Sequence, residues 1–108
     1  MLRVIDLDQY LVMKEKDIVQ VFIFLLDGEY SHLGENTSLF YGFNYPVYLV
    51  RMTEDEFHSM DISVHPKVFC TKDGKEFFEL NGIPTAKFLK HKMNHLKNHI
   101  HNFLQLML

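Results

Sequence analysis

A nearly unbroken apolar run, Ile18 to Leu26, limits the fold of this chain most strongly. Only Gln20 interrupts it, and β-branched and aromatic residues dominate, whereas a half-exposed strand alternates apolar with polar residues. A strand of this kind is buried on both faces, and helices on both faces of a sheet are what bury it. The run therefore predicts an α/β protein built around one central strand.

Shorter apolar segments, turn signals and helix caps predict the elements around this strand. Thr53 and Glu56 have the spacing of a capping box, Thr85 can cap the final helix, and Asp73-Gly74 separates two apolar runs as in a tight hairpin. The other expected elements are a strand at 2–5, a helix at 6–16, strands at 47–52, 67–71 and 76–80, and a loop-rich stretch at 28–44 with a short helix at 38–41. The order β-α-β-(α)-β-α-β-β-α predicts a mixed sheet flanked by helices, with a C-terminal hairpin and an extended C-terminal helix. At 108 residues the chain is expected to form a single domain over 1–108, with 97–108 as a helical extension.

The stretch 64–76 (VHPKVFCTKDGKE) is similar to the thioredoxin family. A proline opens a strand, apolar residues follow, and Lys-Asp-Gly-Lys makes the turn; Leu80-Asn81-Gly82 and the capped helix also fit. The resemblance covers about 18–26 and 46–96, and it implies a thioredoxin-like fold. It also implies a cis His65–Pro66 bond, which costs only about 0.5–1 kcal/mol relative to trans. His65 and Pro66 would then shape the surface beside the family's redox site.

The two-cysteine motif of that family is missing. In thioredoxins CxxC lies just after the central strand, where a helix N-terminus lowers the thiol pKa. This position holds 27–32 (DGEYSH), and Ser31 cannot replace a thiolate because a hydroxyl is far less acidic. The chain has one cysteine, Cys70, which excludes dithiol chemistry. Cys70 falls inside a predicted strand, where a cysteine usually serves as a small apolar residue, and a single-cysteine redox protein is the alternative.

The final helix carries a heptad pattern that continues past the length a thioredoxin-like domain needs. Its apolar positions are Leu89, Met93, Leu96, Ile100, Phe103 and Met107. The first positions are expected to pack on the sheet. The later ones are predicted to form an interface with another protein or with a copy of this chain: Leu96, Ile100, Phe103, Leu104 and Met107.

The same helix is basic and rich in histidine. Four lysines and no acids follow Pro84, whereas the rest of the chain has seven basic and fourteen acidic residues. His91, His95 and His99 share a face, but no acid after Glu79 completes a metal site, and we expect none. The charge asymmetry favours an acidic partner, RNA or an acidic copy of the chain. The net charge of −3 and the missing motifs argue against general nucleic-acid binding.

These observations predict a non-catalytic thioredoxin-like module that binds protein, without catalytic residues, cofactor, metal or small-molecule substrate. Chaperones, assembly factors and structural subunits, phage or viral ones included, are the expected classes. The alternatives are an enzyme, either a thiol redox protein using Cys70 or an activity built around His32, and an RNA- or metal-binding role for the final helix. The longest apolar run is too short to span a bilayer, and acids interrupt the start of the chain, so we expect a cytoplasmic protein without a membrane partner.

Overall fold

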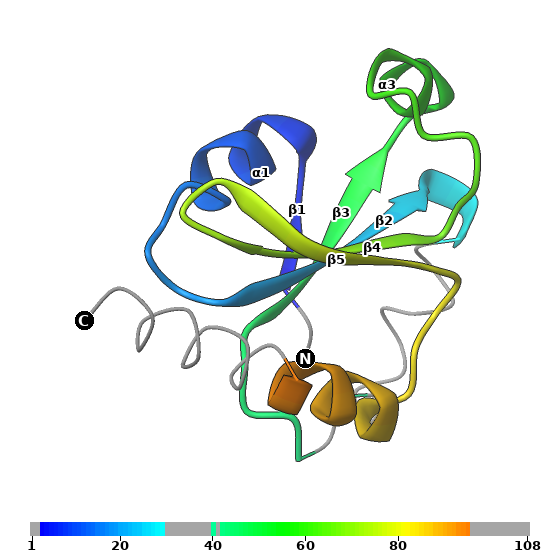
Figure 1. Ribbon diagram of the computed structural model, residues 1–108. Coiled ribbons are helices and arrows are strands. Elements are labelled where there is room, and N and C mark those ends of the chain that lie inside the picture. The colour runs from blue at the N-terminus through cyan, green and yellow to red at the C-terminus, as the bar shows by residue number, and fades with distance from the viewer. Residues whose placement is uncertain (1–2, 30–39, 41, 96–108) are drawn as a thin grey trace.

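The computed structural model describes residues 3–29, 40 and 42–95 (Figure 1). Its strands and helices follow the predicted order, and the predicted fold class is confirmed. The elements are β1 (Arg3–Ile5), α1 (Leu7–Met13), β2 (Gln20–Leu26), β3 (Val47–Met52), α3 (Glu54–Ser59), β4 (Lys67–Lys72) and β5 (Lys75–Asn81). Residues 27–29 and 86–95 are also helical. None of the helices in these ranges is long and apolar enough to cross a membrane.

The apolar run forms the middle of a five-stranded sheet with the order β1-β3-β2-β4-β5. β1 and β2 both run parallel to β3, whereas β4 is antiparallel to β2 and to β5. Ile23 lies opposite Leu49 of β3 on one side and Val68 of β4 on the other. The sheet is therefore mixed, as predicted, with a C-terminal hairpin at one edge.

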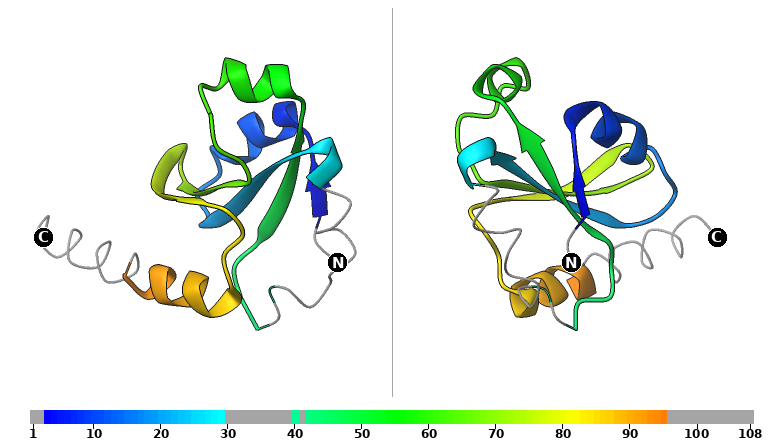
Figure 2. Two further views of the ribbon diagram at one scale, coloured as in Figure 1. Left: turned by 90° about the vertical axis from the view of Figure 1, so that its right-hand side faces the viewer. Right: turned by 180° about the vertical axis from the view of Figure 1, so that it is seen from behind.

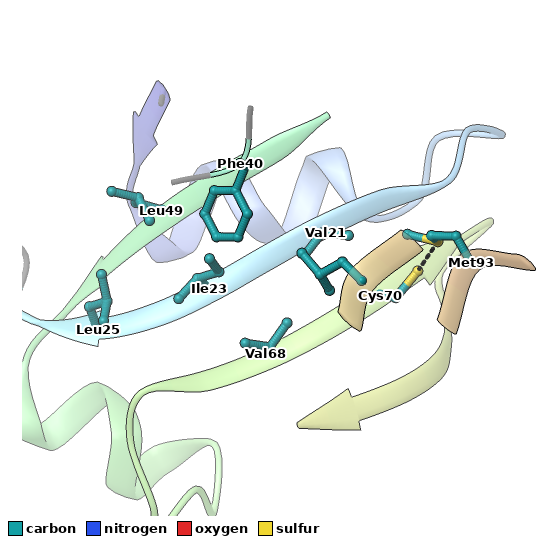
Figure 3. Packing of buried hydrophobic residues seen from close by; sticks show 9 residues of the cluster. Val21, Ile23, Leu25, Phe40, Leu49, Val68, Cys70 and Met93 are labelled. Carbon is teal, nitrogen blue, oxygen red and sulfur yellow. Dashed lines mark hydrogen bonds between the residues drawn. The ribbon is translucent and has the colours of Figure 1, made fainter. Parts of the chain in front are cut away.

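Alternate residues of β2 face two separate apolar layers. Val21, Ile23 and Leu25 pack with residues from the helix at 86–95, on the face drawn in Figure 3. Phe22 and Phe24 face the opposite layer, where the Tyr10 ring of α1 meets them edge-on with centroids 4.9 and 4.7 Å away. Helices thus cover both faces of the sheet (Figure 2). This arrangement explains why β2 has apolar residues at consecutive positions.

Local capping decides where the helices begin. Asp6 and Gln9 form a reciprocal capping box at α1, and Thr53 and Glu56 form the predicted one at α3. The Thr85 hydroxyl accepts a hydrogen bond of 3.1 Å from the Phe88 backbone N–H, so the predicted cap of the last helix is also confirmed. These side chains satisfy backbone N–H groups that the first helical turn leaves without partners.

The expected extent of the first helix, 6–16, was too long. α1 ends at Met13, and the carbonyls of Lys14 and Lys16 accept hydrogen bonds of 2.8 and 2.9 Å from the backbone N–H groups of Gly74 and Asp73. Asp73 and Gly74 form the predicted hairpin turn, with φ angles of 53° and 77°. The turn after β4 therefore determines how the chain leaves α1.

A second expectation also needs correction. The stretch 28–44 was predicted to be loop-rich, but its first two residues, 28 and 29, are helical together with Asp27. A glycine within a helix costs only about 1 kcal/mol relative to alanine, so Gly28 does not prevent a helix here. A helix therefore begins directly after β2. The short helix expected at 38–41 and the rest of the stretch 30–39 lie outside the described residues.

Candidate binding surface around Pro66

The chain direction of three strands brings Pro66 beside the start of the helix that follows β2. β2 and β3 are parallel, so their carboxyl ends meet at one edge of the sheet. β4 runs the other way, and its first residue, Lys67, lies opposite Phe24 near the end of β2. The segment before β4 therefore lies next to the residues that follow β2.

His65 and Glu29 form the closest polar contact at this edge. The His65–Pro66 bond is cis, which confirms the prediction from the resemblance. His65 Nδ1 lies 2.7 Å from Glu29 Oε1, and the same carboxylate oxygen accepts a hydrogen bond of 3.1 Å from the Leu26 backbone N–H. The side chains of His65 and Glu29 are 35% and 32% exposed. The pair therefore joins the segment before β4 to the end of β2 and still reaches the surface.

An apolar contact completes the environment of His65. Its ring lies beside the ring of Phe57 from α3, with centroids 5.0 Å apart, and Phe57 is buried in the layer that includes Phe24. Val64, the preceding residue, is 48% exposed. Glu29, Val64, His65 and Pro66 together are called the Pro66 surface below. The Pro66 surface therefore combines an exposed apolar side chain with a carboxylate–imidazole pair.

Acidic groups lie next to this surface. Asp27 Oδ1 is 2.9 Å from Arg51 Nε, an ion pair in which both side chains are largely exposed. A hollow of about 450 Å³ lies between the ends of β2 and β3, and its lining includes Asp27, Glu54 and Asp55. Arg51 offsets only one of these carboxylates. The described lining of this hollow therefore carries a net negative charge.

Glu29 is the residue that sequence reasoning did not identify as part of this surface. It lies 36 positions before His65, and its place in the stretch 27–32 was the only available signal. His65 and Pro66 were predicted, and the structure places His65 in contact with Glu29. Tyr30, Ser31 and His32, from the same stretch, lie outside the described residues.

Cys70 does not belong to this surface. It is fully buried in β4, on the face covered by the helix at 86–95, and its Sγ lies 4.0 Å from the Met93 Sδ (Figure 3). Burial raises the pKa of the Cys70 thiol to about 12. The thiolate is the reactive form of cysteine, and at neutral pH this thiol is almost entirely protonated. The geometry is that of a small apolar core residue.

The final helix matches its predicted pattern as far as it is described. Leu89 and Met93 are buried against the sheet, as expected for the first half of the heptad. His91 and His95 are exposed, and their rings meet edge-on with centroids 4.6 Å apart. Among the residues that the structure describes, no group of three His, Cys, Asp or Glu side chains could hold a metal ion. The predicted interface residues lie outside the described residues: Leu96, Ile100, Phe103, Leu104 and Met107.

Comparison with known proteins identifies similar solved structures only. No protein-family model matches the chain, and no curated protein matches it. Among solved structures, thioredoxin f2 of Chlamydomonas reinhardtii aligns with a TM-score of 0.60 and 16% identity, over 88% of this chain and 96% of that one. Thioredoxin of Malassezia sympodialis aligns with a TM-score of 0.54 and 18% identity, over 87% and 91%. A designed protein aligns with a TM-score of 0.62 and 18% identity, over 88% of this chain and 96% of that one.

These alignments cover most of both chains at low identity, so they establish the fold and no shared activity. The His65–Glu29 pair lies at the edge where the thioredoxin resemblance places the redox dithiol, and the one cysteine is buried elsewhere. The chain therefore has a thioredoxin-like fold that lacks the CxxC motif.

Proposed function

We propose that this protein is a non-catalytic thioredoxin-like module that binds another protein at the Pro66 surface. One observation carries the proposal: a carboxylate–imidazole pair and an exposed valine occupy the edge beside the cis-proline. Groups suited to contact a partner are exposed at this edge, whereas the one thiol, which redox chemistry would need, is buried. The proposal includes chaperones, assembly factors and structural subunits, phage or viral ones among them.

In the described lining of the hollow beside Asp27, the one side-chain hydroxyl is engaged as a helix cap, which supports a binding role over a catalytic one. Among the described residues that line this hollow, Thr53 carries the hydroxyl group. Its oxygen caps α3 by accepting a hydrogen bond from the Glu56 backbone N–H. A catalytic hydroxyl needs an adjacent base to take its proton. His65 Nδ1 is bonded to Glu29, and among the described residues no hydroxyl is hydrogen-bonded to the other ring nitrogen.

The chemistry of the Pro66 surface defines the partner segment that we expect. Val64 offers an apolar contact, and Asp27, Glu54 and Asp55 add negative charge nearby. A partner segment with an apolar side chain flanked by lysine or arginine complements both features. Its association rate should fall as the salt concentration rises, because exposed charges are screened.

A matched pair of substitutions tests this surface. Val64→Asp places a charge on the Pro66 surface, and Val12→Asp places the same charge on α1, where Val12 is 70% exposed. Captured proteins are identified by mass spectrometry with the unaltered chain as bait, and the main candidate is then purified and titrated. We expect Val64→Asp to weaken binding at least tenfold and Val12→Asp to leave it unchanged. Equal binding by both variants would exclude the Pro66 surface.

The C-terminal heptad pattern supports a second interaction surface in this proposal. Its residues are those predicted from the sequence: Leu96, Ile100, Phe103, Leu104 and Met107. Light scattering of the full chain and of a chain ending before Phe103 separates self-association from partner binding. A full-length oligomer that becomes a monomer on truncation supports self-association, and a monomer in both cases removes that part of the proposal.

A further inference from the structure

A second hollow, of about 400 Å³, lies at the amino end of β3, between the segment 42–46 and the helix at 86–95. Figures 1 and 2 show these two segments side by side at the end of the molecule opposite α3. β3 separates this hollow from the edge that carries Asp27 and Thr53, because the segment 42–46 precedes β3 and α3 follows it. The hollow is therefore independent of the Pro66 surface.

Two aromatic residues form one side of the hollow. The rings of Phe43 and Tyr45 lie with centroids 5.7 Å apart, tilted by 50°. Phe43 packs against the core, and its backbone N–H donates a 3.0 Å hydrogen bond to the Phe40 carbonyl. Tyr45 is 37% exposed. The partly buried ring of Phe43 supports the exposed ring of Tyr45, so Tyr45 offers an aromatic face on which a planar ring can stack.

Lys90 supplies a positive charge at the opposite side. Its side chain lies over Gly42, where a Cβ atom would be only 3.2 Å from the ammonium nitrogen. Gly42 has a φ of 79°, so a side chain there would be strained as well. Among the described residues no carboxylate pairs with Lys90, and the sequence contains no acid after Glu79. The ammonium is therefore available to an anion.

Amide groups complete the lining. Asn44 and Asn94, both exposed, come from the segment before β3 and from the helix. A side-chain amide presents a donor and an acceptor together, which matches the edge of a nucleobase. An aromatic face, an amide and an ammonium that no carboxylate of the described residues pairs with are thus gathered around one hollow.

We propose that this hollow binds a nucleoside monophosphate, with the base against Tyr45, an asparagine amide at its edge and the phosphate at Lys90. The volume lies within the range of small-molecule sites, and one lysine in the lining suits one phosphate group. The net charge of −3 opposes a long polyanion, which favours a mononucleotide over a nucleic-acid strand. The site is additional to the proposed protein-binding role and does not depend on it.

Calorimetric titration of the full chain with adenosine 5′-monophosphate at low salt tests the proposal. Adenosine alone and inorganic phosphate alone separate the contributions of the ring and the anion. Tyr45→Ala should weaken nucleotide binding by about 5- to 150-fold, the range of one lost stacking contact, whereas Tyr45→Phe should retain it. Lys90→Gln should weaken binding about tenfold through the lost charge-assisted contact, and it should remove much of the salt dependence.

Lys75→Gln, an exposed lysine at the start of β5, is the matched control and should leave the affinity unchanged. Circular dichroism of each variant shows whether the fold is kept. Two results would overturn the proposal: a dissociation constant for the nucleotide above about 10 mM, or inorganic phosphate binding as tightly as the nucleotide. An affinity that Tyr45→Ala leaves unchanged in a folded variant would overturn it too.

Discussion

Iodoacetamide should alkylate Cys70 about 1,000-fold more slowly at pH 7 than it alkylates the same thiol in the unfolded chain. Burial raises the pKa of the Cys70 thiol from its ordinary value of 9.0 to about 12, and three pKa units lower the thiolate fraction by about 1,000-fold at neutral pH. Since the residue is fully buried, the reagent must also wait for the structure to open. The factor of about 1,000 applies to attack on the closed structure, whereas attack on an opened structure, in which the thiol has its ordinary pKa, is slowed by the opening equilibrium instead.

Mass spectrometry of timed aliquots measures this rate, because each alkylation adds one fixed mass to a chain that has one cysteine. The chain unfolded in guanidinium chloride provides the reference rate at the same pH. Cys70→Ala, which should incorporate no label, controls for reaction at other side chains.

A native rate within about tenfold of the unfolded rate would refute the reasoning. It would mean that Cys70 is exposed to solvent as a partly ionised thiol, and the single-cysteine redox hypothesis would then be favoured over the binding module. A disulfide-reduction assay on the same preparation should show no turnover, and turnover abolished by Cys70→Ser would lead to the same revision.

Three further predictions concern stability. The free energy of unfolding should fall between about pH 9 and pH 12, because the pKa of Cys70 is higher in the folded chain and the unfolded chain therefore loses that proton first. Denaturant titrations at several pH values should show a smaller fall for Cys70→Ala than for the unaltered chain. Equal falls would contradict the burial argument. Tyr10→Phe should leave the free energy of unfolding unchanged or raise it by about 1 kcal/mol, because the buried Tyr10 hydroxyl has no hydrogen-bond partner in the described residues. Burial also raises the pKa of this hydroxyl. A loss of stability in urea denaturation would show that the hydroxyl is hydrogen-bonded. Gly74→Ala should lower the free energy of unfolding by about 1–2 kcal/mol, because Gly74 has a φ of 77° and a Cβ atom there would meet the Glu15 carboxylate. Gly82→Ala carries only the penalty for the positive φ and should cost less. Equal losses of stability in the two variants would exclude a contribution from Glu15.

Much of the fold could be predicted from short-range patterns. The apolar run of β2, the capping box of Thr53 and Glu56, the Thr85 cap and the Asp73-Gly74 turn each act within a few residues. Such patterns can be recognised in a sequence because the interacting groups are separated by only one helical turn or one tight turn. The extent of α1 could not be predicted in this way, because the carbonyls that follow the helix accept hydrogen bonds from the Asp73-Gly74 turn, nearly 60 residues away.

The candidate surface shows the same division between local and long-range information. One cysteine cannot form CxxC, so the absence of dithiol chemistry follows from the sequence, and the family resemblance pointed to His65 and Pro66. The contact between Glu29 and His65 and the burial of Cys70 in the core became visible in the structure. The structure also places Tyr45 and Lys90 in the lining of one hollow. These relations depend on which strands are neighbours and in which direction each runs, and sheet topology brings together residues that no local pattern connects.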